Sequence, residues 1–452
     1  MKKTPLEKWI GGKLPDTHGS LSERIARYQL QKLRETVAYV RERNSFYRGL
    51  YAGVVDDPAR DFAAFSRLPF TTAGHLRREG MKMLCTSQDE IERVVTLQSS
   101  GTTGPPKRLF FTAEDLETTI DFFAHGMATL VEPKDTVIIF LPGTLQDSVG
   151  DLLARALVRT KVKPVVWGPI RDTAAARAEI MQHPNSCLVG IPTQILALAR
   201  GDYGRIIPHG WVKSVLLSTD YVPAAIEREL ERCWGCRVLT HYGMTETGLG
   251  GGVECTAGEG YHLREADLYT EVVDPVSGLP LPDGEEGEVV FTTLNRKGMP
   301  LVRYRTGDRA RLITTPCSCG TVLKRLGRVQ GRIETEVRLK DGQRLRMSDL
   351  DEVLFPIPGV LDFIAQVDSQ GRRDQLRLCI HAVPGGEERV ARRTLSALLH
   401  GAVTGTLFKE KVLYLENIAF SNTGWMGNGV VKRQIQDRRV SDTVQLLHCS
   451  YG

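Results

Sequence analysis

The chain has 452 residues and a formal net charge of +5, with 41% hydrophobic and 25% charged residues. This balance is that of a globular protein of two or three domains and excludes a fibrous or disordered chain. The small positive charge does not imply nucleic-acid binding, and no apolar run reaches the roughly 18 residues of a membrane-spanning helix. Nine cysteines do not form a disulfide framework, and no apolar run follows the basic N-terminus. We therefore expect a cytoplasmic protein without a signal peptide, a membrane segment or a nucleic-acid partner.

The first expected element is a helix over residues 18–48, where apolar residues recur at helical spacing. Ser20 and Glu23 have the spacing of a capping box at its start. From about residue 94 to residue 310, short apolar strands alternate with helical stretches, which predicts a parallel or mixed sheet covered by helices. The expected strands are 137–141, 163–167, 187–191, 212–217 and 237–239, and the expected helices are 145–159, 172–182, 193–200 and 223–233.

The pattern changes after about residue 333. A turn at Asp341-Gly342 joins two short strands, and Ser348 with Asp351 marks the start of a helix. The elements expected next are strands at 360–367 and 375–383, a helix at 387–400 and a strand near 411–415. The sequence therefore predicts an α/β protein with a large multi-sheet N-terminal domain, residues 1–331, and a small α+β C-terminal domain, residues 332–452. A hinge at Gly331-Arg332 would join them, and a cleft between domains is a common place for a ligand.

Residues 96–107 form the most informative stretch of the sequence. Glycines let backbone amides approach an anion, hydroxyl groups donate hydrogen bonds, and a lysine supplies charge. The spacing differs from that of a Walker loop. The stretch predicts a phosphate-binding loop made of Ser99, Ser100, Gly101, Thr102, Thr103, Gly104 and Lys107.

This loop resembles the phosphate loop of acyl-adenylate-forming enzymes. Four further stretches agree with that family in the same order along the chain. They are Ser218-Thr219-Asp220-Tyr221, Tyr242-Gly243-Met244-Thr245-Glu246-Thr247, Tyr304-Arg305-Thr306-Gly307-Asp308 and Gly327-Arg328-Val329-Gln330-Gly331-Arg332. The first is similar to the adenine-contacting segment, in which the family often has Gly-Glu.

The short lead-in to the loop and the runs 287–294, 299–308 and 316–320 are similar to phenylacetate-CoA ligases. This resemblance implies a reaction in two steps that uses ATP, Mg²⁺ and CoA. An acid, an aryl acid by resemblance, is first joined to AMP, and the thiol of CoA then displaces AMP. The resemblance also implies a homodimer.

The same resemblance implies roles for individual residues. Thr245 would bond the α-phosphate, Glu246 would hold Mg²⁺, Asp308 would accept from the ribose hydroxyls and Tyr242 would stack on adenine. The remaining nucleotide-binding residues would be Ser218, Thr219, Asp220, Gly243, Met244 and Arg328. The acyl pocket would include Trp167 and Gly248, with Gly248–Gly252 as a flexible wall. His241 departs from the family, and two interpretations stay open: it shapes this pocket, or it is a packing residue.

Cys255, His262, Cys317 and Cys319 can together supply the four ligands of a closed, structural zinc site. Similar sets occur in some phenylacetate-CoA ligases. The C-x-C spacing of Cys317 and Cys319 also fits the alternative of reduced thiols in a loop with a surface histidine, so both interpretations stay open.

One position departs from the family. Aligned through Gly429 and Arg433, the catalytic lysine position holds Val430, which can neither donate a hydrogen bond nor carry charge. Lys432 could take the role through a shifted backbone, adenylation could be slow or need a special substrate, or the chain could be a nucleotide-binding pseudoenzyme. A further alternative is acyl transfer to an amine or a carrier protein instead of CoA.

Overall fold

The computed structural model describes residues 2–54, 57–97, 105–201, 207–370, 373–421 and 432–439. The chain divides into two compact units. The first unit comprises Met1–Asp135, Pro142–Val166 and Leu239–Val329, and the second comprises Thr136–Leu141, Trp167–Val238 and Gln330–Gly452. The domain boundary expected at Gly331-Arg332 stays a prediction.

Helices α2 (Leu21–Arg43) and α3 (Ser45–Leu50) of the first unit begin where the sequence supplies side-chain caps. The Ser20 side chain accepts a hydrogen bond from the Glu23 backbone N–H, and the Glu23 carboxylate accepts from the Ser20 N–H, so the expected capping box is present. The helix ends at Asn44, whose side chain caps the next helix by accepting from the Tyr47 N–H. The early helices are α1 (Pro5–Lys13), α2 (Leu21–Arg43), α3 (Ser45–Leu50), α4 (Phe62–Phe65) and α5 (Ala73–Glu79).

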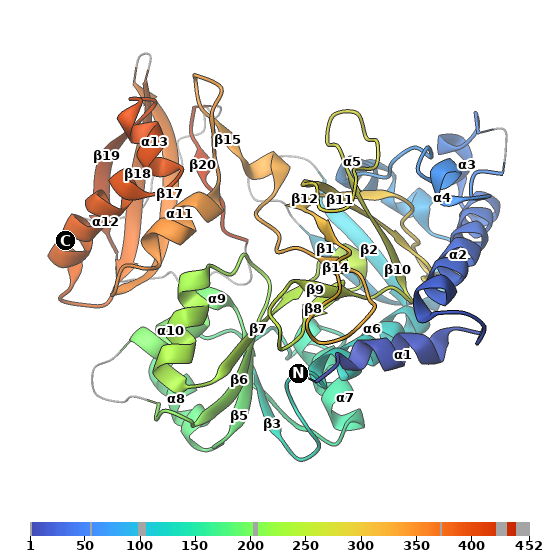
Figure 1. Cartoon of the computed structure of the whole chain (residues 1–452), viewed down its shortest axis with the longest axis horizontal. Coiled ribbons are helices and arrows are strands. Elements are labelled where there is room, and N and C mark those ends of the chain that lie inside the picture. Colours follow the sequence, from blue (N-terminus) through green and yellow to red (C-terminus); the bar gives the residue numbers. More distant parts are fainter. Residues whose placement is uncertain are drawn as a thin grey trace. The chain divides into compact units, whose positions relative to one another are not determined.

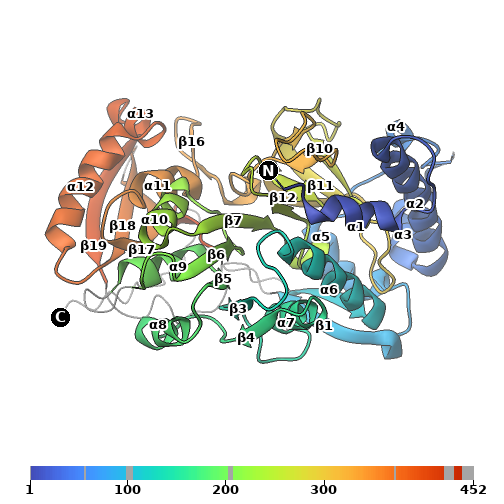
Figure 2. The same ribbon diagram turned by 60° about the horizontal axis from the view of Figure 1, so that its bottom comes forward.

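Three sets of strands build the rest of the first unit. A hairpin pairs β1 (Ile91–Leu97) with β2 (Lys107–Thr112), and an antiparallel sheet orders β10 (Leu268–Val273), β11 (Gly287–Thr293) and β12 (Tyr304–Ala310). A third set has the order β13-β14-β9-β8-β7. Its members are β7 (Arg237–Tyr242), β8 (Gly252–Glu254), β9 (Tyr261–Leu263), β13 (Leu312–Ile313) and β14 (Arg325–Leu326), and the unit also holds α6 (Ala113–Met127), α7 (Val149–Arg159) and β4 (Lys163–Val166). Helices α6 and α7 pack side by side (Figure 2).

The second unit combines a parallel strand set with a smaller α+β sheet. Strands β6, β5 and β3 are neighbours in parallel, and their buried apolar residues explain the continuous apolar runs in the sequence. These elements are β3 (Thr136–Ile139), α8 (Thr173–Met181), β5 (Ser186–Gly190), α9 (Pro192–Arg200), β6 (Val212–Leu217) and α10 (Ala224–Trp234). The other sheet has the order β19-β18-β17-β20, with α11, α12 and α13 beside it (Figure 1). Strands β15 and β16 pair with each other in a separate two-stranded sheet. The elements of this part of the second unit are β15 (Val337–Arg338), β16 (Arg344–Leu345), α11 (Met347–Leu354), β17 (Val360–Gln370), β18 (Arg373–Ala382), α12 (Glu387–His400), α13 (Thr404–Lys409), β19 (Leu413–Phe420) and β20 (Gln436–Asp437).

The expected start of α11 needs a correction. The helix begins at Met347, and the carboxylate that accepts the Arg346 N–H is Asp349, at 2.8 Å. Asp351 is instead buried and paired with Arg433 at 2.6 Å. The spacing of Ser348 and Asp351 is typical of a capping pair, but Asp351 is buried and pairs with Arg433 instead.

Candidate active site

Three motif residues of the first unit meet at one carboxylate. Glu246 lies in the short 3₁₀ helix Thr245–Thr247, Lys107 begins β2 and Tyr304 begins β12. The Lys107 ammonium donates to Glu246 Oε1 at 2.5 Å, and the Tyr304 hydroxyl donates to the same oxygen at 3.1 Å. The Glu246 side chain is only 3% exposed. Its carboxylate fits Mg²⁺ chemically, since this cation prefers carboxylate oxygen.

A hydrogen bond joins a second pair of motif residues, Tyr242 at the end of β7 and Asp308 within β12. The Tyr242 hydroxyl donates to Asp308 Oδ2 at 3.1 Å, and both residues are buried. The Asp308 N–H donates to the Thr306 hydroxyl, which itself donates to the Val289 carbonyl. The sheet therefore fixes a carboxylate beside the aromatic ring expected to contact adenine.

The turn after β7 needs glycine at Gly243. A Cβ atom there would lie 2.5 Å from the Leu249 carbonyl oxygen, a backbone atom that cannot move aside easily. Met244 in the same turn is buried. Arg328, expected among the nucleotide-binding residues, pairs with the buried Glu254 on β8 at 2.9 Å.

His241 and Gly248 also lie in the first unit. The His241 ring packs against Phe122 and Phe123, with ring centroids 6.3 and 6.4 Å away. Burial lowers the pKa of His241 to about 4, so its ring is neutral near pH 7. Gly248 has a left-handed backbone with φ 75°, and its carbonyl accepts from the Thr119 hydroxyl at 2.9 Å.

The segment expected to contact adenine, Ser218–Tyr221, lies in the second unit directly after β6. Thr219 has φ 83°, a conformation that costs a β-branched residue about 1–3 kcal/mol and is typical of functional sites. Ser218 precedes it, and the Ser218 N–H donates to the Gly190 carbonyl at 3.1 Å. Burial raises the pKa of Asp220, while the nearby Arg433 and Lys432 act to lower it.

Arg433, the arginine that aligns the C-terminal motif with the family, contacts the segment expected to bind adenine. Its backbone N–H donates to Asp220 Oδ2 at 3.3 Å. Its guanidinium pairs with Asp351 at 2.6 Å and Asp362 at 2.8 Å. Lys432, which precedes it, is exposed. Within the second unit, the C-terminal stretch that carries Lys432 is therefore tied to Asp220, in the segment expected to contact adenine.

The remaining predicted residues fall elsewhere. Trp167 lies in the second unit, is 36% exposed and donates its backbone N–H to the Ile139 carbonyl at 3.1 Å. Ser99, Ser100, Gly101, Thr102, Thr103, Gly104 and Val430 lie outside the described residues.

The cysteine and histidine set is assembled in the first unit. The ligand atoms of Cys255, His262, Cys317 and Cys319 all lie within 4.8 Å of one another, and all four residues are buried. The Cys255 and Cys317 sulfurs are 3.6 Å apart, and the Cys319 sulfur is 3.7 Å from His262 Nε2. A tetrahedral zinc ion with ordinary bond lengths needs edges of about 3.5–3.8 Å, so this donor set fits the metal. The alternative of a surface histidine is wrong, because His262 is 0% exposed.

A family model described as AMP-binding enzyme matches residues 67–295, just over half of the chain. The chain therefore belongs to the AMP-binding enzyme family, which confirms the resemblance inferred from the motifs.

Two similar proteins indicate which kind of AMP-binding enzyme this chain resembles. The phenylacetate-coenzyme A ligase of Thermus thermophilus is 28% identical over 383 residues, which cover 83% of this chain and 85% of that protein. That of Aromatoleum evansii is 27% identical, with coverage of 84% and 87%. These relatives confirm the predicted class, an AMP-forming acid–thiol ligase resembling phenylacetate-CoA ligases.

A solved structure of 2-hydroxyisobutyryl-CoA ligase in the postadenylation state, bound to R3-HIB-AMP, matches with a TM-score of 0.76. The match covers 92% of this chain and 90% of that structure at 19% identity, which confirms the α/β multi-sheet fold. Within the described residues, no helix combines the length and apolar character needed to cross a membrane.

Proposed function

We propose that this chain activates an aryl carboxylic acid with ATP and transfers the acyl group to CoA. The observation that carries the proposal is the meeting of Lys107, Glu246 and Tyr304, three motif residues far apart in sequence, at one buried carboxylate. The aryl acid and the CoA acceptor are supported by the similarity to phenylacetate-coenzyme A ligases. A cytoplasmic location and a homodimer remain predictions from sequence and resemblance.

Adenylation is the attack of a carboxylate on the α-phosphate of ATP, with pyrophosphate leaving. Negative charge builds on the phosphates, so the protein must supply positive charge and hydrogen-bond donors there. We assign this role to Lys107 and Thr245, together with the loop of residues 99–104. Glu246 would hold Mg²⁺, which supplies further neutralising charge when bound.

Tyr242 and Asp308 would hold the nucleoside. The Asp308 carboxylate suits two ribose hydroxyls as an acceptor, and Tyr242 supplies the aromatic face for adenine. The segment Ser218–Tyr221 would complete the adenine site. The CoA thiol would then attack the acyl-adenylate carbonyl, with AMP as the leaving group that the free acid lacks.

Lys432 is our candidate for the lysine that Val430 does not provide. It is exposed and directly precedes Arg433, whose backbone is anchored to Asp220. The pseudoenzyme alternative rests on Val430 alone. The amine or carrier-protein alternative concerns only the second half-reaction.

Carboxylate-dependent ATP–pyrophosphate exchange over a panel of aryl and short-chain acids tests the first step. Fast exchange with phenylacetate or a related aryl acid is expected, and exchange only with short-chain acids would reject the aryl assignment. Binding of ATP without exchange for any acid would support the pseudoenzyme. Release of AMP from a preformed acyl-adenylate on addition of CoA, without a carrier protein, is expected for the second step.

We also propose that Cys255, His262, Cys317 and Cys319 hold a structural zinc ion. Four protein ligands leave no open position for chemistry, so the ion would stabilise the loop 315–320 against β8 and β9. Metal analysis of the purified protein is expected to give about one zinc per chain and less than about 0.2 in Cys317→Ser, since a closed site binds zinc tightly. Cys233→Ser, outside the cluster, is the matched control. Wild type with less than about 0.2 zinc would reject the proposal.

A further inference from the structure

The segment that follows β7 is held by side chains from three separate parts of the chain. Along Glu246–Gly251, the carbonyls of every second residue, at 246, 248 and 250, each accept a hydrogen bond from a side chain of the first unit. These donors are Arg296, Thr119 and Arg264. None of them belongs to the motifs that predicted the active site.

Arg296 contacts Glu246, the residue that would hold Mg²⁺ in the proposed function. Its Nη1 donates to the Glu246 carbonyl at 2.7 Å, and its guanidinium stacks on the Phe111 ring at 5.0 Å. Burial lowers the pKa of Arg296 to about 10, which still leaves the group charged at pH 7. A charged donor to a carbonyl is stronger than a neutral one.

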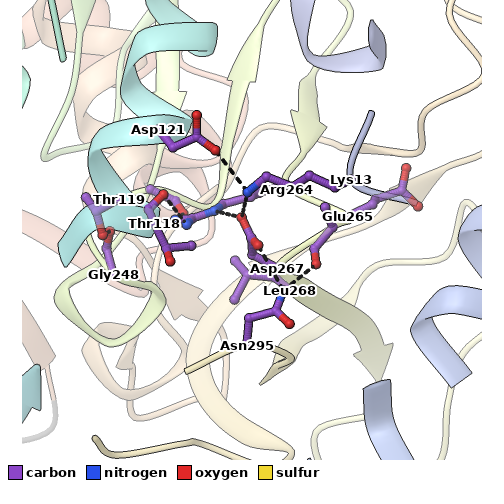
Figure 3. Close-up of polar contacts among 12 residues, drawn as sticks. Lys13, Thr118, Thr119, Asp121, Gly248, Arg264, Glu265, Asp267, Leu268 and Asn295 are labelled. Carbon is purple, nitrogen blue, oxygen red and sulfur yellow. Dashed lines mark hydrogen bonds and ion pairs between the residues drawn. The ribbon is translucent and has the colours of Figure 1, made fainter. Parts of the chain in front are cut away.

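Thr119 and Arg264 hold the next turn. The Thr119 hydroxyl on α6 donates to the Gly248 carbonyl at 2.9 Å, and Arg264 donates to the Gly250 carbonyl at 3.4 Å. Arg264 is itself fixed by Asp267 at 2.7 Å and by the Thr118 carbonyl at 2.7 Å (Figure 3). The segment that the sequence suggested as a flexible wall is therefore tied at regular intervals.

Packing alone does not hold the segment Glu246–Gly251, because a cavity lies beside it. A cavity of about 20 Å³, enough for one water molecule, is lined by Thr119, Gly248, Arg264 and Arg296 among others. A side chain at Gly248 would come within 3.1 Å of Arg296 Nη2 and 3.2 Å of the Thr119 hydroxyl. Loss of a donor would leave both an unpaired carbonyl and space for the segment to shift.

We propose that Arg296, with Thr119 and Arg264, positions the Thr245–Gly248 turn so that the Glu246 carboxylate faces the site of the metal–nucleotide complex. These are positioning residues, since they bond the backbone of the turn. The inference rests on the function proposed above for Glu246. It predicts that the first half-reaction, which uses ATP and Mg²⁺, depends on Arg296 more than the second does.

The test compares Arg296→Met and Arg296→Lys with wild type. Calorimetry of ATP binding with and without Mg²⁺ needs no turnover, and Arg296→Met is expected to lose on the order of tenfold in the Mg²⁺-dependent part of the affinity. Exchange with phenylacetate should show a similar rise in the Mg²⁺ requirement. AMP release from phenylacetyl-adenylate and CoA should change less than twofold, and Arg296→Lys should recover part of the loss.

Two further variants distinguish the proposed positioning role from a general folding defect. Thr119→Val removes one hydroxyl at nearly constant volume and is expected to weaken Mg²⁺-dependent ATP binding about threefold. Arg177→Met is the matched control, because Arg177 is a buried arginine of the second unit that also donates to backbone carbonyls, those of Leu198 and Ala197. Wild-type Mg²⁺ dependence in both Arg296→Met and Thr119→Val, or an equal loss in both half-reactions, would overturn the inference. Absence of exchange in wild type would instead reject the proposed function, with the calorimetry still deciding the role of Arg296.

Discussion

The Lys107 ammonium lies 2.5 Å from the Glu246 carboxylate, although 139 residues separate them in the chain. Each neutralises the other at a nearly buried position, with side chains 12% and 3% exposed. Binding of ATP with Mg²⁺ would give each a new partner of opposite charge, a phosphate for Lys107 and the cation for Glu246. Such an exchange would leave neither charge buried without compensation, which is the costly outcome.

Lys107→Met should therefore damage nucleotide activation more than removal of an ordinary surface charge. We expect exchange to fall by about 10²–10³, the usual effect of losing one positioned donor to developing charge. Lys82→Met is the control, because Lys82 is a 66% exposed lysine paired with Glu79. Equal exchange in the Lys107 and Lys82 variants would contradict the role of Lys107.

Lys432→Ala tests the C-terminal lysine. If Lys432 has replaced the absent lysine, exchange should fall by about 10²–10³ while ATP binding changes little. Lys409→Ala, at an exposed position on α13, should exchange like wild type. Undiminished exchange in Lys432→Ala would mean that adenylation proceeds without this lysine.

Arg433→Met should destabilise the second unit in a pH-dependent way. Burial raises the pKa of Asp351 to about 7 from 3.8, even though Arg433 acts to lower it. The folded state therefore holds a proton that the unfolded chain releases between about pH 4 and 7, so this group contributes less stability as the pH rises. Without Arg433 the charged form of Asp351 has no partner, and the loss at pH 8 should reach about 3–5 kcal/mol.

At pH 6, where more Asp351 is protonated, the loss in Arg433→Met should be smaller. Urea unfolding of the variant and wild type at the two pH values measures the difference. Arg392→Met, at a 72% exposed position, should have little effect at either pH. A loss of the same size at pH 6 and pH 8 would show that Asp351 does not carry the effect.

The sequence predicted the fold well where local signals were strong. Strand 212–217 and helix 387–400 lie within the observed bounds, because an apolar run and an amphipathic period mark them directly. The sequence did not reveal α6, whose Thr112–Asp115 capping box was present as a signal. Pairings such as Arg296 with the Glu246 carbonyl depend on residues 50 positions apart, which no local pattern encodes.

Zinc bound at the Cys255, His262, Cys317 and Cys319 site should stabilise helix α1 as well as the loop 315–320. The Glu7 carboxylate on α1 accepts from the Thr321 hydroxyl at 2.7 Å and from the Val322 N–H at 2.9 Å, just after the Cys317–Cys319 turn. Cys317→Ser should therefore increase hydrogen exchange in α1 as well as in residues 315–322. Cys233→Ser should leave both segments at wild-type protection, and unchanged exchange of α1 in Cys317→Ser would disprove the coupling.

His241 should make the first unit sensitive to mild acid. Its pKa is lowered to about 4 by burial, whereas an unfolded histidine titrates near 6.5. Between these values the unfolded chain binds more protons. The contribution of His241 to the free energy of unfolding is therefore fully present above about pH 6.5 and falls as the pH drops toward 4.

From pH 6.5 to pH 5 one such histidine lowers the free energy of unfolding by about 2 kcal/mol. His241→Phe keeps an aromatic ring against Phe122 and Phe123 and should reduce the loss between pH 7 and pH 5 by about 2 kcal/mol in urea unfolding. His18→Gln, at an exposed position, is the control, and an acid sensitivity equal to wild type in His241→Phe would reject this role for His241.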